Sequence, residues 1–195
     1  MLAAAGCDAA SAGGTTASVS ADANVARAGA YSFSDELGGF RIVSAAGTGT
    51  RDDPITVVQE LTSATPVTMV IRAEASVQPF GATGSIANGF IHMRIVINNS
   101  SGLPWVEFEF ELQERLGVPS GFGDGLSFDQ RKGESDNIGS DSFARYSRDF
   151  EPYDRLRYEN GTVDPLATAG FRFFITDFTP RWTFYLVEDP RIPSS

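Results

Sequence analysis

The groups best suited to chemistry in this chain are oxygen donors in one glycine- and serine-rich stretch, residues 114–148. Calcium takes about six to eight hard oxygen ligands, usually from a flexible loop. The composition therefore indicates either a calcium site or a solvated acidic loop, and its spacing does not match an EF-hand. The predicted calcium ligands are Asp124, Asp129, Glu134, Asp136 and Asp141.

A row of carboxylates in residues 105–113 suggests a second chemistry. Three glutamates alternate with apolar residues, and side chains on a strand point to alternate faces. The pattern predicts a strand with one buried face and one wet, acidic face. Paired carboxylates can hydrolyse glycosides, but an exposed polar stripe opposite a core is the favoured interpretation. The glutamates are Glu107, Glu109 and Glu111.

Nucleophilic and cofactor chemistry are disfavoured. The single histidine, His92, lies in an apolar strand pattern, where a structural role is favoured over a catalytic one. The single cysteine, Cys7, lies outside the predicted fold, which excludes a disulfide within one chain and a cysteine-type zinc site. The sequence contains no nucleophile elbow, Walker A loop or dinucleotide fingerprint, so no catalytic residue is predicted.

The aromatic residues and the net charge limit the kinds of partner that we expect. Exposed aromatics favour carbohydrate binding, and Trp105 and Trp182 are the candidates; burial in the core or at its edge is the alternative. The net charge of -10 argues against a nucleic-acid partner, because such proteins need basic patches. No apolar run approaches the roughly 20 residues that a membrane helix needs.

The elements that must position these residues are short strands. Alternating or apolar runs separated by turn residues predict an all-β, antiparallel β-sandwich with jelly-roll or Greek-key connections. The five-residue turn 98–102 predicts a hairpin-type connection between two of the strands. A single domain is expected over residues 31–195, with the long acidic loop near 114–148. The expected strands are residues 40–43, 55–61, 65–73, 90–98, 105–113, 126–128, 153–158, 170–177 and 182–188.

Residues 1–30 are expected to form a signal remnant or flexible tether, because they are rich in alanine, serine, glycine and threonine. Ala4-Ala5-Gly6-Cys7 resembles the lipobox of bacterial lipoproteins, in which the cysteine is lipidated. The positive and apolar regions of a signal peptide are missing. The alternative is a disordered leader that happens to contain a cysteine.

Four stretches of the folded part resemble a loose group of exported bacterial β-sandwich proteins, of the PEP-CTERM and choice-of-anchor kind. They are an Asn-rich turn before a tryptophan (97–105), a DGLSF stretch (123–128), YDRLRYENGTVDP (153–165) and FYLVEDP (184–190). The resemblance implies export and a β-sandwich, with no established catalytic activity. The group's C-terminal anchor has no counterpart in this sequence, which leaves Cys7 as the anchor candidate.

These observations predict an exported, surface-associated bacterial protein with a binding or structural role and no defined catalytic activity. The alternative is a carbohydrate-binding module or, less favoured, a glycoside hydrolase with paired carboxylates. The expected partner is a glycan or another surface protein, and a lipid anchor would be the only contact with a membrane.

Overall fold

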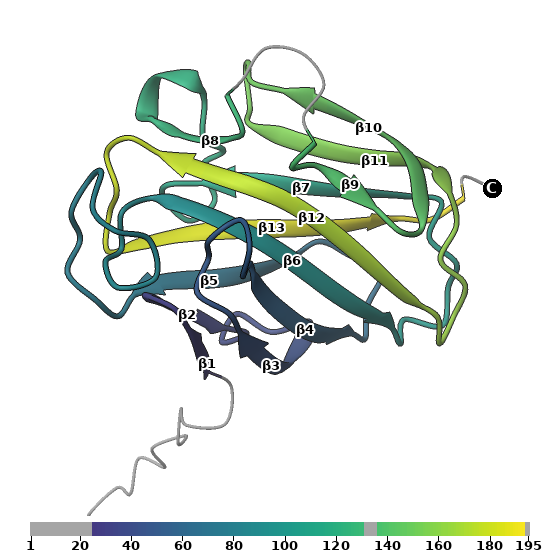
Figure 1. The fold of residues 1–195 in the computed structure, drawn as a ribbon. Coiled ribbons are helices and arrows are strands. Elements are labelled where there is room, and N and C mark those ends of the chain that lie inside the picture. Colours follow the sequence, from purple (N-terminus) through teal and green to yellow (C-terminus); the bar gives the residue numbers. More distant parts are fainter. Residues whose placement is uncertain (1–24, 131–135, 194–195) are drawn as a thin grey trace, which may run out of the picture.

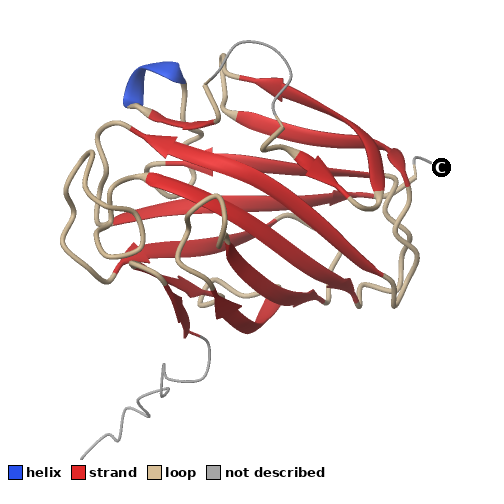
Figure 2. Cartoon of the chain, in the orientation of Figure 1, coloured by secondary structure: helices blue, strands red, loops and turns tan. Residues whose placement is uncertain are grey.

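Alternating apolar side chains fold the chain into two β-sheets that pack face to face (Figures 1 and 2). The computed structural model describes residues 25–130 and 136–193. Nearly all regular structure in these residues is strand, apart from one short 3₁₀ turn, η2 (Phe122–Asp124). The prediction of an all-β sandwich is confirmed.

Sheet A has seven strands, all joined by antiparallel pairs. In spatial order they are β1 (Val25–Ala28), β2 (Tyr31–Ser34), β5 (Val67–Ala73), β13 (Thr183–Arg191), β7 (Glu107–Gln113), β11 (Arg155–Gly161) and β10 (Phe143–Asp149).

Sheet B has six strands, and its centre is the long antiparallel pair of β6 and β12 (Figure 1). Strands β4 and β6 run parallel, because the chain between them crosses to sheet A as β5 and then returns. In order the strands are β3 (Phe40–Ala46), β4 (Ile55–Leu61), β6 (Phe90–Asn99), β12 (Thr168–Asp177) and β8 (Leu126–Phe128), while the short β9 (Gly139–Ser140) also pairs with β12.

The core between the sheets is rich in phenylalanine. Phe110 of β7 lies 5.2 Å from Phe171 and 5.0 Å from Phe173 of β12, measured between ring centroids. All three rings are buried. The Tyr158 hydroxyl of sheet A donates a 2.9 Å hydrogen bond to the Arg172 carbonyl of sheet B. This bond satisfies a buried polar group while joining the two layers.

The hairpin predicted at the turn 98–102 is wrong, because β6 and β7 belong to different sheets. Strand β6 lies in sheet B and β7 in sheet A, and both turn their apolar faces into the core between the sheets. Asn99 holds this corner: its Nδ2 donates to the carbonyls of Leu103 at 2.8 Å and Val163 at 3.0 Å.

Two expected boundaries also differ from the structure. The described fold includes β1, which starts at Val25 rather than near Tyr31 and pairs with β2 through a turn at Gly29, whose φ is 56°. The stretch 114–148, expected to be a loop, contains β8, β9 and most of β10. Strand β10 is an edge strand with only one buried residue, Phe143, so it lacks the alternation that marks a half-buried strand.

A polar pair is buried inside the core. Gln59 of β4 donates a hydrogen bond to Glu188 of β13 across the two sheets, and both residues are fully buried. Burial raises the pKa of Glu188 to about 8. One further oxygen on each side chain, Gln59 Oε1 and Glu188 Oε1, has no partner among the described residues. A protonated Glu188 supplies the donor that this pair of oxygens needs.

The first prediction concerns pH. Folded Glu188 keeps its proton between its ordinary pKa of 4.5 and about 8, whereas the unfolded chain releases it. This contribution to stability is complete below pH 4.5 and falls as pH rises through the window, by at most about 1.4 kcal/mol per pH unit. We expect Glu188→Gln to flatten urea-measured stability between pH 5 and 8 relative to the wild type.

The matched control is Asp52→Asn, which removes one carboxylate at an exposed position. This variant should keep the wild-type pH slope. An unchanged slope in Glu188→Gln would show that Glu188 does not carry a proton in the folded protein.

Candidate functional site

The outer face of sheet B carries an unusual set of side chains on its two central strands. In β6 the residues at odd positions point into the core, so His92 and Arg94 point outward. In β12 the same alternation turns Arg172 and Phe174 outward. The register pairs His92 with Phe174 and Arg94 with Arg172. An aromatic row and an arginine row therefore lie next to each other on one face.

Aromatic rings extend the first row toward one end of the sheet. The ring centroid of Phe174 lies 4.2 Å from that of His92 and 6.3 Å from that of Phe90. Phe90 in turn lies 5.6 Å from Phe178 and 6.0 Å from Phe80. Phe80 is 74% exposed and Phe178 44% exposed. We call Phe80, Phe90, Phe174 and Phe178 the aromatic cluster.

Beside the aromatic cluster lies a pocket of about 430 Å³. We call it the arginine pocket, because Arg51, Arg94 and Arg172 all line it, together with His92. Arg51 comes from the β3–β4 loop and forms a 2.5 Å ion pair with Asp136. The pocket thus combines three guanidinium groups in a chain whose net charge is -10.

Two glycines shape the wall of the arginine pocket. A Cβ atom on Gly139 would lie 2.6 Å from Arg172 Nη2 and 2.7 Å from its Cζ. The absence of a side chain therefore lets the guanidinium lie against the backbone of β9. At Gly170 a Cβ atom would collide with the Asp141 carboxylate, which accepts a 2.7 Å hydrogen bond from the Gly170 amide.

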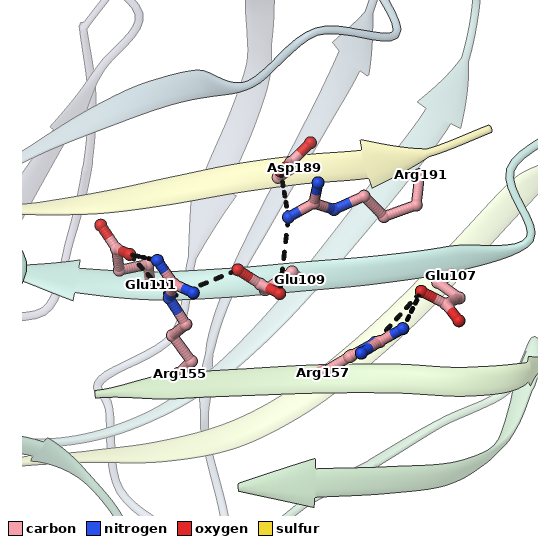
Figure 3. Close-up of polar contacts among 7 residues, drawn as sticks. All are labelled: Glu107, Glu109, Glu111, Arg155, Arg157, Asp189 and Arg191. Atoms are coloured by element: carbon pink, nitrogen blue, oxygen red, sulfur yellow. Dashed lines mark hydrogen bonds and ion pairs between the residues drawn. The ribbon is translucent and has the colours of Figure 1, made fainter. Parts of the chain in front are cut away.

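The acidic stripe of β7 is not the wet carboxylate face that was predicted, because arginines of the neighbouring strands pair with it (Figure 3). Arg155 Nη2 lies 2.8 Å from Glu111, and Arg155 Nε lies 3.5 Å from Glu109. Arg191 lies 3.6 Å from Glu109, and its other contact, with Asp189, is 2.9 Å long. The ion-pair network comprises Glu107, Glu109, Glu111, Arg155, Arg157, Asp189 and Arg191.

Part of this network borders a second hollow, of about 560 Å³. Glu107 and Asp189 line it and are the carboxylates that a glycosidase would need here. Burial raises the pKa of Asp189, an effect that Arg191 opposes. Arg157 Nη2 lies 2.5 Å from Glu107. Each carboxylate is therefore held by a guanidinium.

Four of the five predicted calcium ligands lie among the described residues, and each of these four has a contact with another part of the chain. Asp124 Oδ1 accepts a hydrogen bond from the Leu126 amide, and buried Asp129 accepts one from Asn137. Asp136 pairs with Arg51, and Asp141 binds the Gly170 amide. Within residues 25–130 and 136–193, no three histidine, cysteine, aspartate or glutamate side chains are grouped as a metal site requires.

Glu134 lies outside the described residues, so the calcium site stays a prediction. Cys7, the predicted lipidation site, lies outside them as well.

The two tryptophans that were predicted to bind sugar differ in burial. Trp105 is fully buried, and its Nε1 donates a 3.1 Å hydrogen bond to Ser101 Oγ. It cannot offer a ring face to a ligand, so its assignment as a sugar-binding residue is wrong; burying so large an apolar ring stabilises the core. Trp182 is 62% exposed and remains available.

The residues of the aromatic cluster and the arginine pair were missed by sequence reasoning. The available signal was the outward half of two alternating strands: Phe90, His92 and Arg94 in β6, and Arg172 and Phe174 in β12. Large aromatics at outward positions contradict the usual polar outer face. Their convergence depends on the β6–β12 register, which the sequence does not state.

No protein-family model matches this chain, and no curated protein matches it. None of the described residues forms a helix with the length and apolar character required to cross a bilayer. The site must therefore be interpreted from its own geometry.

The second prediction concerns the ion-pair network. The Glu109 side chain is 14% exposed and lies between two arginines, so removing its charge should cost about 1–2 kcal/mol, between the values for exposed and buried pairs. The Glu107 side chain is 30% exposed and pairs with Arg157, so Glu107→Gln should cost under about 1 kcal/mol. Urea unfolding of Glu109→Gln and Glu107→Gln measures both.

The Glu107→Gln loss should also shrink more strongly in 1 M salt, because exposed pairs are screened more than partly buried ones. Equal losses in the two variants would contradict a network centred on Glu109.

Proposed function

We propose that this protein is a glycan-binding β-sandwich whose binding face is the outer face of sheet B. The observation that carries the proposal is the aromatic cluster, which lies next to the arginine pocket on that face. The same observation favours the carbohydrate-binding alternative over a purely structural role.

The aromatic cluster is difficult to explain as part of the fold. Phe80 and Phe178 expose much of their rings, while the core between the sheets is filled by other phenylalanines. Phe80 also has a φ of 59°, a conformation that a bulky residue rarely adopts. Exposed apolar patches with a polar rim mark interaction sites, and concave sites with aromatic walls and a few polar groups bind small ligands.

Binding is favoured over hydrolysis. A glycosidase needs one carboxyl group to donate a proton and a second to attack or activate water. The carboxylates at the second hollow, Glu107 and Asp189, are each engaged by an arginine. The arginine pocket offers Asp136 and Asp141, and both have partners of their own. Among the described residues, the carboxylates at both places are thus engaged by other groups of the chain.

The setting we propose for this binding is the bacterial cell surface after export. The support comes from the sequence: the lipobox-like Ala4-Ala5-Gly6-Cys7 and the tether-like residues that follow it. A lipid on Cys7 and a flexible tether would hold the sandwich near a membrane while leaving sheet B accessible to a glycan.

The third prediction tests the binding face. We expect the full chain to bind at least one soluble polysaccharide in a panel of neutral and uronic-acid polymers, measured by affinity electrophoresis and calorimetry. The double variant Phe80→Ala/Phe178→Ala should weaken this binding about 10-fold or more, since aromatic anchors dominate interface energetics. Release of reducing ends should stay at background.

The matched control is Leu103→Ala, which truncates another exposed apolar side chain outside the aromatic cluster (45% exposed). It should bind as the wild type does. Trp182→Ala provides a comparison, since the sequence alone pointed to that residue. Loss of binding in Trp182→Ala with full binding in the phenylalanine variant would place the site elsewhere.

Calcium is the second ligand that we propose, at the acidic stretch predicted from Asp124 to Asp141, and the fourth prediction tests it. A ligand that binds only the folded state raises the melting temperature. If the stretch binds calcium, millimolar calcium after EGTA should raise the melting temperature by several degrees, and magnesium should not. The Glu134→Gln variant should show a smaller rise. An unchanged melting temperature would remove calcium from the proposal.

A further inference from the structure

We propose that Arg94 and Arg172 form an oxyanion site for an acidic sugar, so that the glycan bound by sheet B carries carboxylate or sulfate groups. This inference rests on the proposed glycan-binding function and specifies its ligand class. It starts from the cross-strand pairing of the two arginines in the arginine pocket.

Two positive charges lie directly opposite each other on the outer face of sheet B. Arg94 and Arg172 are direct partners on adjacent antiparallel strands, which places their Cβ atoms about 5 Å apart. Like charges directly opposite each other destabilise a sheet. A bound anion between the two guanidinium groups would turn this repulsion into two attractions.

Acidic side chains of the described residues do not balance the charges of these two arginines. Throughout the described chain, neither the Arg94 nor the Arg172 side chain forms an ion pair or a hydrogen bond with another side chain. Arg115 and Arg145 also lack an ion pair there, but neither lines the pocket. The arginines that do pair with acidic residues include Arg27, Arg41, Arg72, Arg155, Arg157, Arg181 and Arg191.

The aspartates that line the arginine pocket already have partners of their own. Asp136 pairs with Arg51 at 2.5 Å. Asp141 accepts hydrogen bonds from the Gly170 amide at 2.7 Å and from the Ser142 hydroxyl at 2.9 Å. Neither acid forms an ion pair with Arg94 or Arg172. The arginine row therefore faces the pocket with its charge available to a ligand.

The spacing between the arginine row and the aromatic row matches the size of a sugar acid. The Arg94–Arg172 row lies two residues along each strand from the His92–Phe174 row, a step of about 7 Å. A sugar ring over Phe174 and His92 would place an acidic group within reach of the guanidinium groups. Arginine binds planar carboxylates through two parallel hydrogen bonds, and Gly139 leaves room for the Arg172 guanidinium against the wall.

Nucleic acid is the less favoured polyanion. A chain with a net charge of -10 repels a long phosphate backbone. Of the three arginines in the pocket, Arg51 already pairs with Asp136, and the other two select a single anionic group rather than a continuous backbone.

The fifth prediction compares polygalacturonate with its fully methyl-esterified form, which keeps the sugar ring but removes the charge. We expect the full chain to bind polygalacturonate at least 10-fold more tightly than the ester, measured by calorimetry at low salt. Arg94→Gln and Arg172→Gln should each lose about 10-fold of affinity for the acid and keep the weaker affinity for the ester. Arg145→Gln removes another exposed arginine, which lies outside the pocket and has no ion pair among the described residues, and this variant should bind as the wild type does.

The other outcomes separate this inference from the proposed function. Equal affinity for acid and ester, lost in Phe80→Ala/Phe178→Ala but not in the arginine variants, overturns the oxyanion site and keeps glycan binding. Absence of binding to every polysaccharide tested overturns both. Arginine-dependent binding of a sulfated glycan but not polygalacturonate assigns the site to a sulfate ester. Equal, arginine-dependent binding of a single-stranded oligonucleotide overturns the inference in favour of a general polyanion site.

Discussion

The packing of aromatic rings between the two sheets is the interaction on which the rest of the structure depends. Phe108 and Phe110 of β7 meet Phe171 and Phe173 of β12 at centroid distances between 4.7 and 5.2 Å. Fully burying such side chains is worth about 1.5–3 kcal/mol each. Because side chains on a strand alternate, fixing these rings inward also fixes which residues β7 and β12 present to the outside.

The outer faces of the two sheets differ in how their charged side chains are arranged. On sheet A, the glutamates of β7 form ion pairs with arginines of β11 and β13, so residues of the same face offset most of their charge (Figure 3). On sheet B, the register instead places Arg94 opposite Arg172. The Arg94–Arg172 pair and the exposed phenylalanines distinguish sheet B from sheet A and support the proposal that sheet B is the binding face.

The sequence predicted the strands whose environment follows the alternation rule. The bounds of β4 were predicted to the residue, and β6 differed by one residue, because their inward positions are mostly apolar; the exceptions are Gln59 in β4 and Asn99 at the end of β6. The edge strand β10 was missed because it buries only Phe143. The path from β4 through β5 to β6 was also missed, since alternation identifies a strand's faces but not its neighbours.

The candidate site was less predictable for the same reason. The sequence marks Glu107 and Glu111 as carboxylates, but their pairing depends on arginines of β11 that lie 50 and 44 residues away along the chain. Trp105 has the ring that a sugar-binding residue needs, but the fold buries it completely. Phe80 and Phe178 lie in loops, and only the fold brings both rings to Phe90. The sequence shows the chemistry of each single residue, but a site also depends on the distances between residues, which the sequence does not state.

The arginine row is held by the same aromatic core that builds the sandwich. Arg172 lies between buried Phe171 and Phe173, and its carbonyl accepts the Tyr158 hydroxyl from the opposite sheet. Arg94 lies between buried Met93 and Ile95. Both backbones are thus placed before any ligand arrives, on central strands rather than on loops. A binding site built this way would lose little backbone entropy when a ligand binds. In the proposed site, two guanidinium groups and a few exposed rings would then discriminate between ligands without a deep cavity.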